Sequence, residues 1–201
     1  MIRKLLLPAL MFMTLAACSS NTAQNIQATP TKSPEEVKQA LSGLVEQKDE
    51  VEEFSVYYAQ TSIDNIDNSD FYVYFIKDSG GIVKNLHFVV KYVGTAQINT
   101  RWITVNADGQ KFDITNNAKY LLNSSISYNT VTEVYDSSVY LNDLKMIKAM
   151  ANAEKAIVRC TGLGLYEEDI VLSKRQKQAL LNVLRAYKNA GGVNEIYGKE
   201  L

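Results

Sequence analysis

The feature that most constrains the fold of this chain is a series of strand-like segments between residues 54 and 138. These segments are rich in aromatic and β-branched side chains, which favour strands: FSVYYAQ, FYVYFIKD, IVKNLHFVVKYVG, TRWITVN, QKFDIT and SSISYNTVTEVYD. Ser79–Gly80 and Asp108–Gly109 stand where tight hairpins would join neighbouring segments. The pattern predicts an antiparallel meander of strands.

Apolar side chains with helical spacing precede this region. Ser33, Pro34 and Glu36 form a capping box with proline at the first helical position. Apolar residues then recur at steps of three and four positions. We therefore expect one helix from Ser33 to about Gln47.

Two more helices are expected after the strand-rich region. One begins near residue 141, where Asn142 would cap it. The other begins at Ser173, which forms a second capping box with Gln176, and Gly191–Gly192 would end it. Between these helices, AEKAIVRCTG and LYEEDIVL predict a pair of strands.

Together these elements predict one α+β domain, residues 33–201. Its antiparallel sheet of about seven or eight strands would pack with an N-terminal helix, one inserted helix and a C-terminal helix. The segment TSIDNIDNSD is expected to be a polar loop between two strands. A chain of 201 residues can bury one sizeable core.

The N-terminal residues, MIRKLLLPALMFMTLAACSS, combine a basic start with a short apolar run. A helix of about 11 residues reaches only about half of the roughly 30 Å bilayer core. A basic start, a short apolar middle and small residues at the end are typical of a secretory signal peptide. We expect residues 1–17 to be this signal.

The end of that segment, Leu15-Ala16-Ala17-Cys18, resembles the lipobox of bacterial lipoproteins. The resemblance implies cleavage between Ala17 and Cys18 and attachment of acyl chains, palmitate among them, to Cys18. Two or three acyl chains hold a protein at a membrane without a spanning helix. Serine follows the cysteine, which in Gram-negative bacteria favours an outer-membrane position. We expect the domain to face the periplasm, and exposure on the cell surface is the alternative. The polar residues 18–32 would form a flexible tether.

Composition excludes several partners and cofactors. The chain has 21 basic and 22 acidic side chains and no long basic cluster, so no nucleic-acid partner is expected. With Cys18 carrying lipid, Cys160 could form no intrachain disulfide, and its β-branched surroundings predict a core thiol. One histidine and one thiol cannot supply a typical zinc site. We expect no metal and no cofactor.

His87 is the single histidine. In a strand it would share one face with Val89, which favours a half-buried or surface position. A nucleophilic pair of Cys160 with His87 has no accompanying motif and is not favoured. The loop from Asp64 to Asp70 gathers carboxylate and amide oxygens but lacks the spacing of a calcium-binding EF-hand loop. A solvated turn is favoured there, and calcium stays an open alternative.

Tyrosine is abundant, with 12 in the chain. Tyr72 and Tyr74 would share one face of their strand, while the phenylalanines beside them occupy the other. If helices cover the phenylalanine face, the tyrosines would be partly exposed and could stack on a glycan or anchor a protein. Tyr72 and Tyr74 are therefore the candidate binding surface, with simple filling of a half-buried strand as the alternative.

No GxSxG, HExxH or P-loop pattern occurs, so no catalytic residue is assigned. We expect a lipid-anchored envelope protein that acts as a binding, accessory or scaffold module for an envelope protein or a glycan. The alternative is an enzyme acting on cell-wall glycan or another envelope substrate through unidentified carboxylates. A concave pocket with convergent carboxyls of raised pKa would favour the enzyme.

Overall fold

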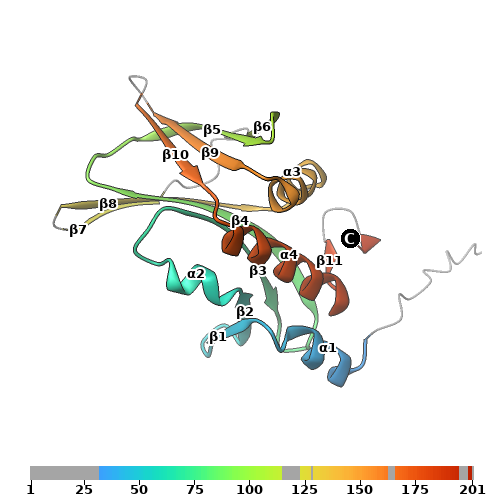
Figure 1. Ribbon diagram of the computed structural model, residues 1–201. Helices are drawn as coiled ribbons and strands as arrows, with labels where there is room; N and C mark the ends of the chain where they lie inside the picture. Colours follow the sequence, from blue (N-terminus) through green and yellow to red (C-terminus); the bar gives the residue numbers. More distant parts are fainter. Residues whose placement is uncertain (1–31, 115–122, 128, 163–165, 195–198, 201) are drawn as a thin grey trace, which may run out of the picture. The chain divides into compact units, whose positions relative to one another are not determined.

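The computed structural model describes residues 32–114, 123–127, 129–162, 166–194 and 199–200 (Figure 1). The described residues form two larger antiparallel sheets, one small strand pair and four helices. The predicted α+β class is confirmed, but the prediction of one sheet was wrong, because the strands divide into a six-stranded and a four-stranded sheet. The helices are α1 (Pro34–Leu41), α2 (Gln60–Asp64), α3 (Leu141–Asn152) and α4 (Lys174–Asn189).

The strands of both larger sheets lie side by side in an order that differs from their order along the chain. From edge to edge, the six-stranded sheet contains β1 (Val45–Asp49), β2 (Phe54–Tyr58), β3 (Asp70–Lys77), β4 (Val83–Gly94), β8 (Thr130–Ser138) and β7 (Asn123–Ser127). The four-stranded sheet contains β10 (Glu167–Val171), β9 (Ala156–Gly162), β5 (Thr100–Ala107) and β6 (Gln110–Ile114). The small pair is β11 (Val193–Asn194) and β12 (Lys199–Glu200).

One face of the six-stranded sheet packs against α4 (Figure 1). Phe71, Val73 and Phe75 on β3 are at most 1% exposed. The ring of Phe75 meets the ring of Tyr187 on α4 edge to face, with 5.2 Å between the ring centroids. Because successive side chains of a strand point to opposite faces, Tyr74 projects from the face away from α4.

The core continues from the six-stranded sheet to α3 and the four-stranded sheet. Val105 on β5 and Val158 on β9 are fully buried in the same cluster as Ile147 of α3. A buried carboxylate, Glu133 on β8, links the two sheets by accepting hydrogen bonds at the start of β5. Its donors are the Asn99 N–H (2.7 Å), the Thr100 N–H (3.0 Å) and the Thr100 hydroxyl (2.8 Å).

Both predicted capping boxes are confirmed. The Ser33 hydroxyl accepts from the Glu36 N–H at 3.3 Å, and the Glu36 carboxylate accepts from the Ser33 N–H at 2.8 Å. Ser173 and Gln176 repeat this arrangement at 3.2 and 2.8 Å. Gly191 follows α4 with φ of 77°, a left-handed conformation that glycine adopts without strain.

Two predictions for the N-terminal part were wrong. The first helix ends at Leu41 and not near Gln47, because the residues beyond Gly43 pair with β2 as strand β1. Glycine is a poor helix former, so strand pairing prevails there. The expected polar loop TSIDNIDNSD begins instead with residues 61–64 of a second inserted helix, α2.

Two later predictions also need correction. The segment SSISYNTVTEVYD is not one long strand but a hairpin in which β7 pairs with β8. Asn142 does not cap α3; instead the Asp143 carboxylate accepts from the Tyr140 N–H at 2.9 Å. An acid in the first helical turn fulfils this role well because it also interacts favourably with the helix dipole.

Candidate functional site

A polar cluster lies on the face of the six-stranded sheet away from α4. It consists of Tyr74, His87, Asp136 and Ser138, and we name it the His87 cluster. Tyr74 on β3 is paired with His87 on β4, and His87 is paired in turn with Ser138 on β8. Asp136 lies two residues before Ser138, so its side chain is on the same face.

Hydrogen bonds join all four members of the cluster. The carboxylate of Asp136 lies 2.8 Å from His87 Nδ1 through Oδ1 and accepts from the Tyr74 hydroxyl at 2.7 Å through Oδ2. The Ser138 hydroxyl lies 3.2 Å from His87 Nε2. A carboxylate beside Nδ1 favours the tautomer with its proton on that nitrogen. Nε2 then accepts from the Ser138 hydroxyl.

Strand geometry brings His87 and Ser138 together. The Val139 N–H donates to the Leu86 carbonyl at 2.8 Å, so these two residues form a hydrogen-bonded pair. In an antiparallel ladder the next pair, His87 with Ser138, is then of the non-hydrogen-bonded type. Side chains of such pairs approach more closely, which brings the hydroxyl within reach of the ring.

A bulge in β4 lies beside the cluster. The pairing of β3 with β4 shifts register between Tyr74 and Ile76, and Asn85 adopts φ of 52°. A bulge bends a strand locally and redirects the side chains next to it. The ring of His87 lies against that of Tyr74, with centroids 5.0 Å apart.

The two candidate tyrosines, Tyr72 and Tyr74, lie on this same face and are half-buried. Burial raises the pKa of Tyr72 to about 12, with the charge of Asp136 adding to the effect. Burial also raises the pKa of Tyr74, and its hydrogen bond to Asp136 raises it further. Both phenols therefore keep their protons at neutral pH, and Tyr74 remains a hydrogen-bond donor.

Asp136 and Ser138 were not foreseen as site residues. Because they are two residues apart in one strand-like segment, the sequence indicates that they share a face. It does not indicate which strand lies beside that segment. Only the pairing of β4 with β8 brings them to His87. The side chain of His87 is 23% exposed and that of Asp136 is 42% exposed, so the cluster is open to solvent.

Cys160 is a core thiol, as predicted. It lies on β9 and is 2% exposed. Burial raises the pKa of its thiol to about 12, and the nearby charge of Glu133 adds to this effect. The thiol therefore stays protonated and unreactive at neutral pH. The ring nitrogens of His87 face Tyr74, Asp136 and Ser138, not this thiol.

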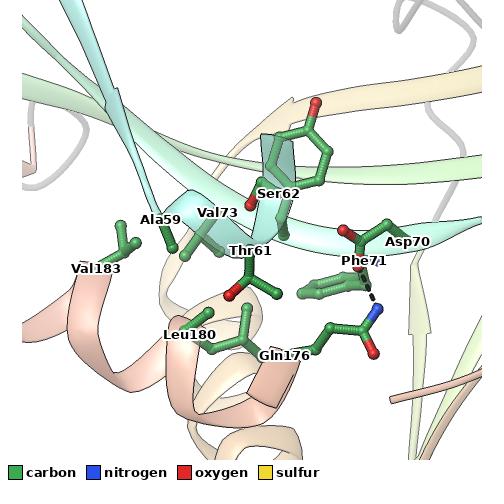
Figure 2. A pocket seen from close by; sticks show the side chains of 11 residues that line it. Ala59, Thr61, Ser62, Asp70, Phe71, Val73, Gln176, Leu180 and Val183 are labelled. Carbon is green, nitrogen blue, oxygen red and sulfur yellow. Dashed lines mark hydrogen bonds between the residues drawn. The ribbon is translucent and has the colours of Figure 1, made fainter. Parts of the chain in front are cut away.

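A small cavity lies between β3, the start of α2 and α4 (Figure 2). Its volume of about 10 Å³ leaves room for no more than one water. At its edge the Asp70 carboxylate accepts from Gln176 Nε2 at 2.7 Å and from the Phe71 N–H at 2.8 Å. Burial raises the pKa of Asp70. The cavity is a gap in packing and is too small for a metabolite.

The carboxylates at the two ends of the 64–70 loop have separate partners. Asp64 forms an ion pair with Arg175 and accepts from Gln60 Nε2 at 2.9 Å. Asp70 instead points to Gln176. Among the residues that the structure describes, no three acidic, histidine or cysteine side chains converge as metal ligands.

Acids near the C-terminal strands are also paired. Arg159 contacts Glu167 at 2.9 Å and Asp169 at 2.7 Å. Burial raises the pKa of the Asp143 carboxyl, as it does that of Asp70. Asp143 does not line the cavity beside Asp70, however. These acids therefore do not form the convergent pocket that a carboxylate enzyme would need.

Cys18, Ala17 and the rest of residues 1–31 lie outside the described residues. Within the described ranges, none of the helices has both the length and the apolar character needed to cross a bilayer. Comparison of the chain with family models, curated proteins and solved structures gave no match.

Proposed function

We propose that this chain is a lipid-anchored protein of the outer membrane that faces the periplasm and binds an envelope protein or a glycan. Cys18 would carry the acyl chains, and the binding surface would be the His87 cluster together with Tyr72. The observation that supports this surface most directly is an exposed carboxylate, Asp136, held among two aromatic side chains and a hydroxyl on the sheet face away from the core.

The chemistry of this surface suits recognition. Tyr74, His87 and Asp136 hold one another in place by hydrogen bonds, so little side-chain entropy is lost when a partner binds. Aromatic rings beside a carboxylate and a hydroxyl can contact both the apolar faces and the hydroxyls of a sugar, or a polar protein surface. The proposed role needs binding alone, as for an accessory or scaffold module.

Site-specific photo-crosslinking in living cells tests the proposal. A crosslinking side chain at position 72 should capture one envelope protein or cell-wall glycan in a fixed ratio to the lipoprotein. The matched control places the same group at Lys111, which is exposed on the four-stranded sheet. Equal crosslinking from both positions, or none from position 72 in envelopes that contain the protein, would contradict the proposal.

A further inference from the structure

We propose that Ser138 is a nucleophile that reacts with exposed carboxylic esters, with His87 as its base and Asp136 as the residue that positions His87. This activity goes beyond the proposed binding role. It rests on the order of hydrogen bonds in the His87 cluster and requires no partner protein.

The connectivity of these three side chains matches the serine–histidine–carboxylate arrangement of hydrolases. The hydroxyl faces Nε2 at 3.2 Å, while the carboxylate faces Nδ1 at 2.8 Å. In that arrangement the imidazole removes the hydroxyl proton, and the carboxylate fixes the tautomer and stabilises the imidazolium that forms. Such arrangements are recognised by geometry and occur on unrelated folds.

The surroundings of the three side chains favour the same assignment. The Tyr74 hydroxyl donates to the second oxygen of Asp136, which fixes the plane of the carboxylate toward His87. The β4 bulge at Asn85 lies two residues before His87, and bulges often re-aim side chains next to active sites. Ser138 is the last residue of β8 and is a partly exposed residue.

The position of the cluster indicates the class of substrate. The side chains of His87 and Asp136 are 23% and 42% exposed, so the cluster faces solvent. A small molecule that needs an enclosing pocket is therefore not favoured. An ester that projects from a larger molecule, such as an acyl ester on a polymer, can reach side chains that are exposed in this way.

The reaction balances with water as the second substrate. Ser138 Oγ attacks the carbonyl carbon while its proton passes to His87 Nε2. The ester C–O bond then breaks, and the proton leaves with the departing alkoxide as an alcohol. Water attacks the acyl-serine, gives a proton to Nε2, and the carboxylic acid is released as that proton returns to Oγ.

A fluorophosphonate reagent tests the nucleophile without knowledge of the natural ester. Attack by Ser138 forms an O–P bond, breaks the P–F bond and releases fluoride, while the hydroxyl proton goes to Nε2. Mass spectrometry of peptides from the full-length protein should place the phosphonyl group on Ser138. Labelling should be lost in Ser138→Ala, and its rate should fall about 100-fold in His87→Gln, the usual contribution of a general base. Asp136→Asn should also slow labelling, because it removes the carboxylate that fixes the tautomer of His87.

Ser125→Ala is the matched control, because Ser125 is exposed on the neighbouring strand β7. It should be labelled on Ser138 at the same rate as the unsubstituted protein. Urea unfolding of each variant shows whether it is folded, and Ser138→Ala removes only one oxygen from a partly exposed residue. Absence of label on Ser138, or an unchanged labelling rate in folded His87→Gln, would overturn the proposal. Neither result depends on crosslinking from position 72, so the two proposals can fail separately.

Discussion

Asp70 is a carboxyl that the fold removes almost completely from water, with 1% of the residue exposed. Burial raises its pKa in the folded state above the unfolded value of about 3.9. The stability that it contributes is therefore fully present below the unfolded pKa and is lost as pH rises through the folded pKa. Asp70→Asn keeps an oxygen for Gln176 and Phe71 but cannot ionise. We expect Asp70→Asn to gain stability relative to the unsubstituted protein as pH rises from about 4 to 7.

Urea unfolding at several pH values measures this difference. Asp78→Asn is the control, and its stability should change with pH in the opposite direction. The reason is that hydrogen bonds from Lys84 and from the Ile82 N–H lower the pKa of Asp78. Its ionised form adds stability above the unfolded pKa, and that contribution is lost as pH falls. The control should therefore lose stability relative to the unsubstituted protein mainly as pH rises toward about 4, below the range in which Asp70→Asn gains stability. A pH-independent difference for Asp70→Asn would show that Asp70 titrates normally.

Glu133 offers a second prediction for a single residue. Its carboxylate receives three hydrogen bonds at the start of β5 while only 1% of the residue is exposed. Glu133→Ala leaves those donors without a partner and opens a gap, so we expect a loss of about 3 kcal/mol in the free energy of unfolding. Glu133→Gln keeps one acceptor oxygen and should lose less. Equal stabilities in urea for all three proteins would contradict this role.

Among the elements, α4 covers β3 and begins at the Ser173 capping box. Ser173→Ala removes the acceptor for the Gln176 N–H and should cost about 1 kcal/mol of stability, as measured by urea unfolding. Ser33→Ala removes the same kind of cap from α1, which has only Leu41 as a buried residue. We expect a smaller loss there, and a larger loss for Ser33→Ala would mean that α1 matters more to the core than α4.

The sequence predicted structural features that depend on neighbouring residues, but it did not predict those that depend on pairing with distant strands. Both capping boxes and the Asp108–Gly109 hairpin were predicted, because neighbouring residues determine them. Strand β1 was missed because helical spacing through residue 45 does not reveal the partner strand β2. The β7–β8 hairpin was missed because its alternating residues also fit one long strand.

At the scale of the whole molecule, strand order creates the His87 cluster. His87 is 49 residues from Asp136 and 51 residues from Ser138, and β8 lies beside β4 although β5, β6 and β7 come between them along the chain. Tyr72 and Tyr74 could be assigned to one face from alternation alone. No local pattern specifies the register that places a hydroxyl against Nε2, and for this reason His87 was expected to be an ordinary strand residue.

In the proposed function, Cys18 determines where the whole molecule lies in the cell. Cys18→Ser removes the sulfur that would carry acyl chains, and the expected product is an uncleaved precursor that retains residues 1–17. Intact mass should show acyl additions on the unsubstituted protein, and on the variant none, together with the extra mass of residues 1–17. Cys160→Ser is the matched control, because it alters the buried thiol of β9 and should leave lipidation unchanged. Mature protein isolated from cells without acyl chains on Cys18 would contradict the proposed lipid anchor. The fold and the reactivity expected of Ser138 do not depend on that anchor.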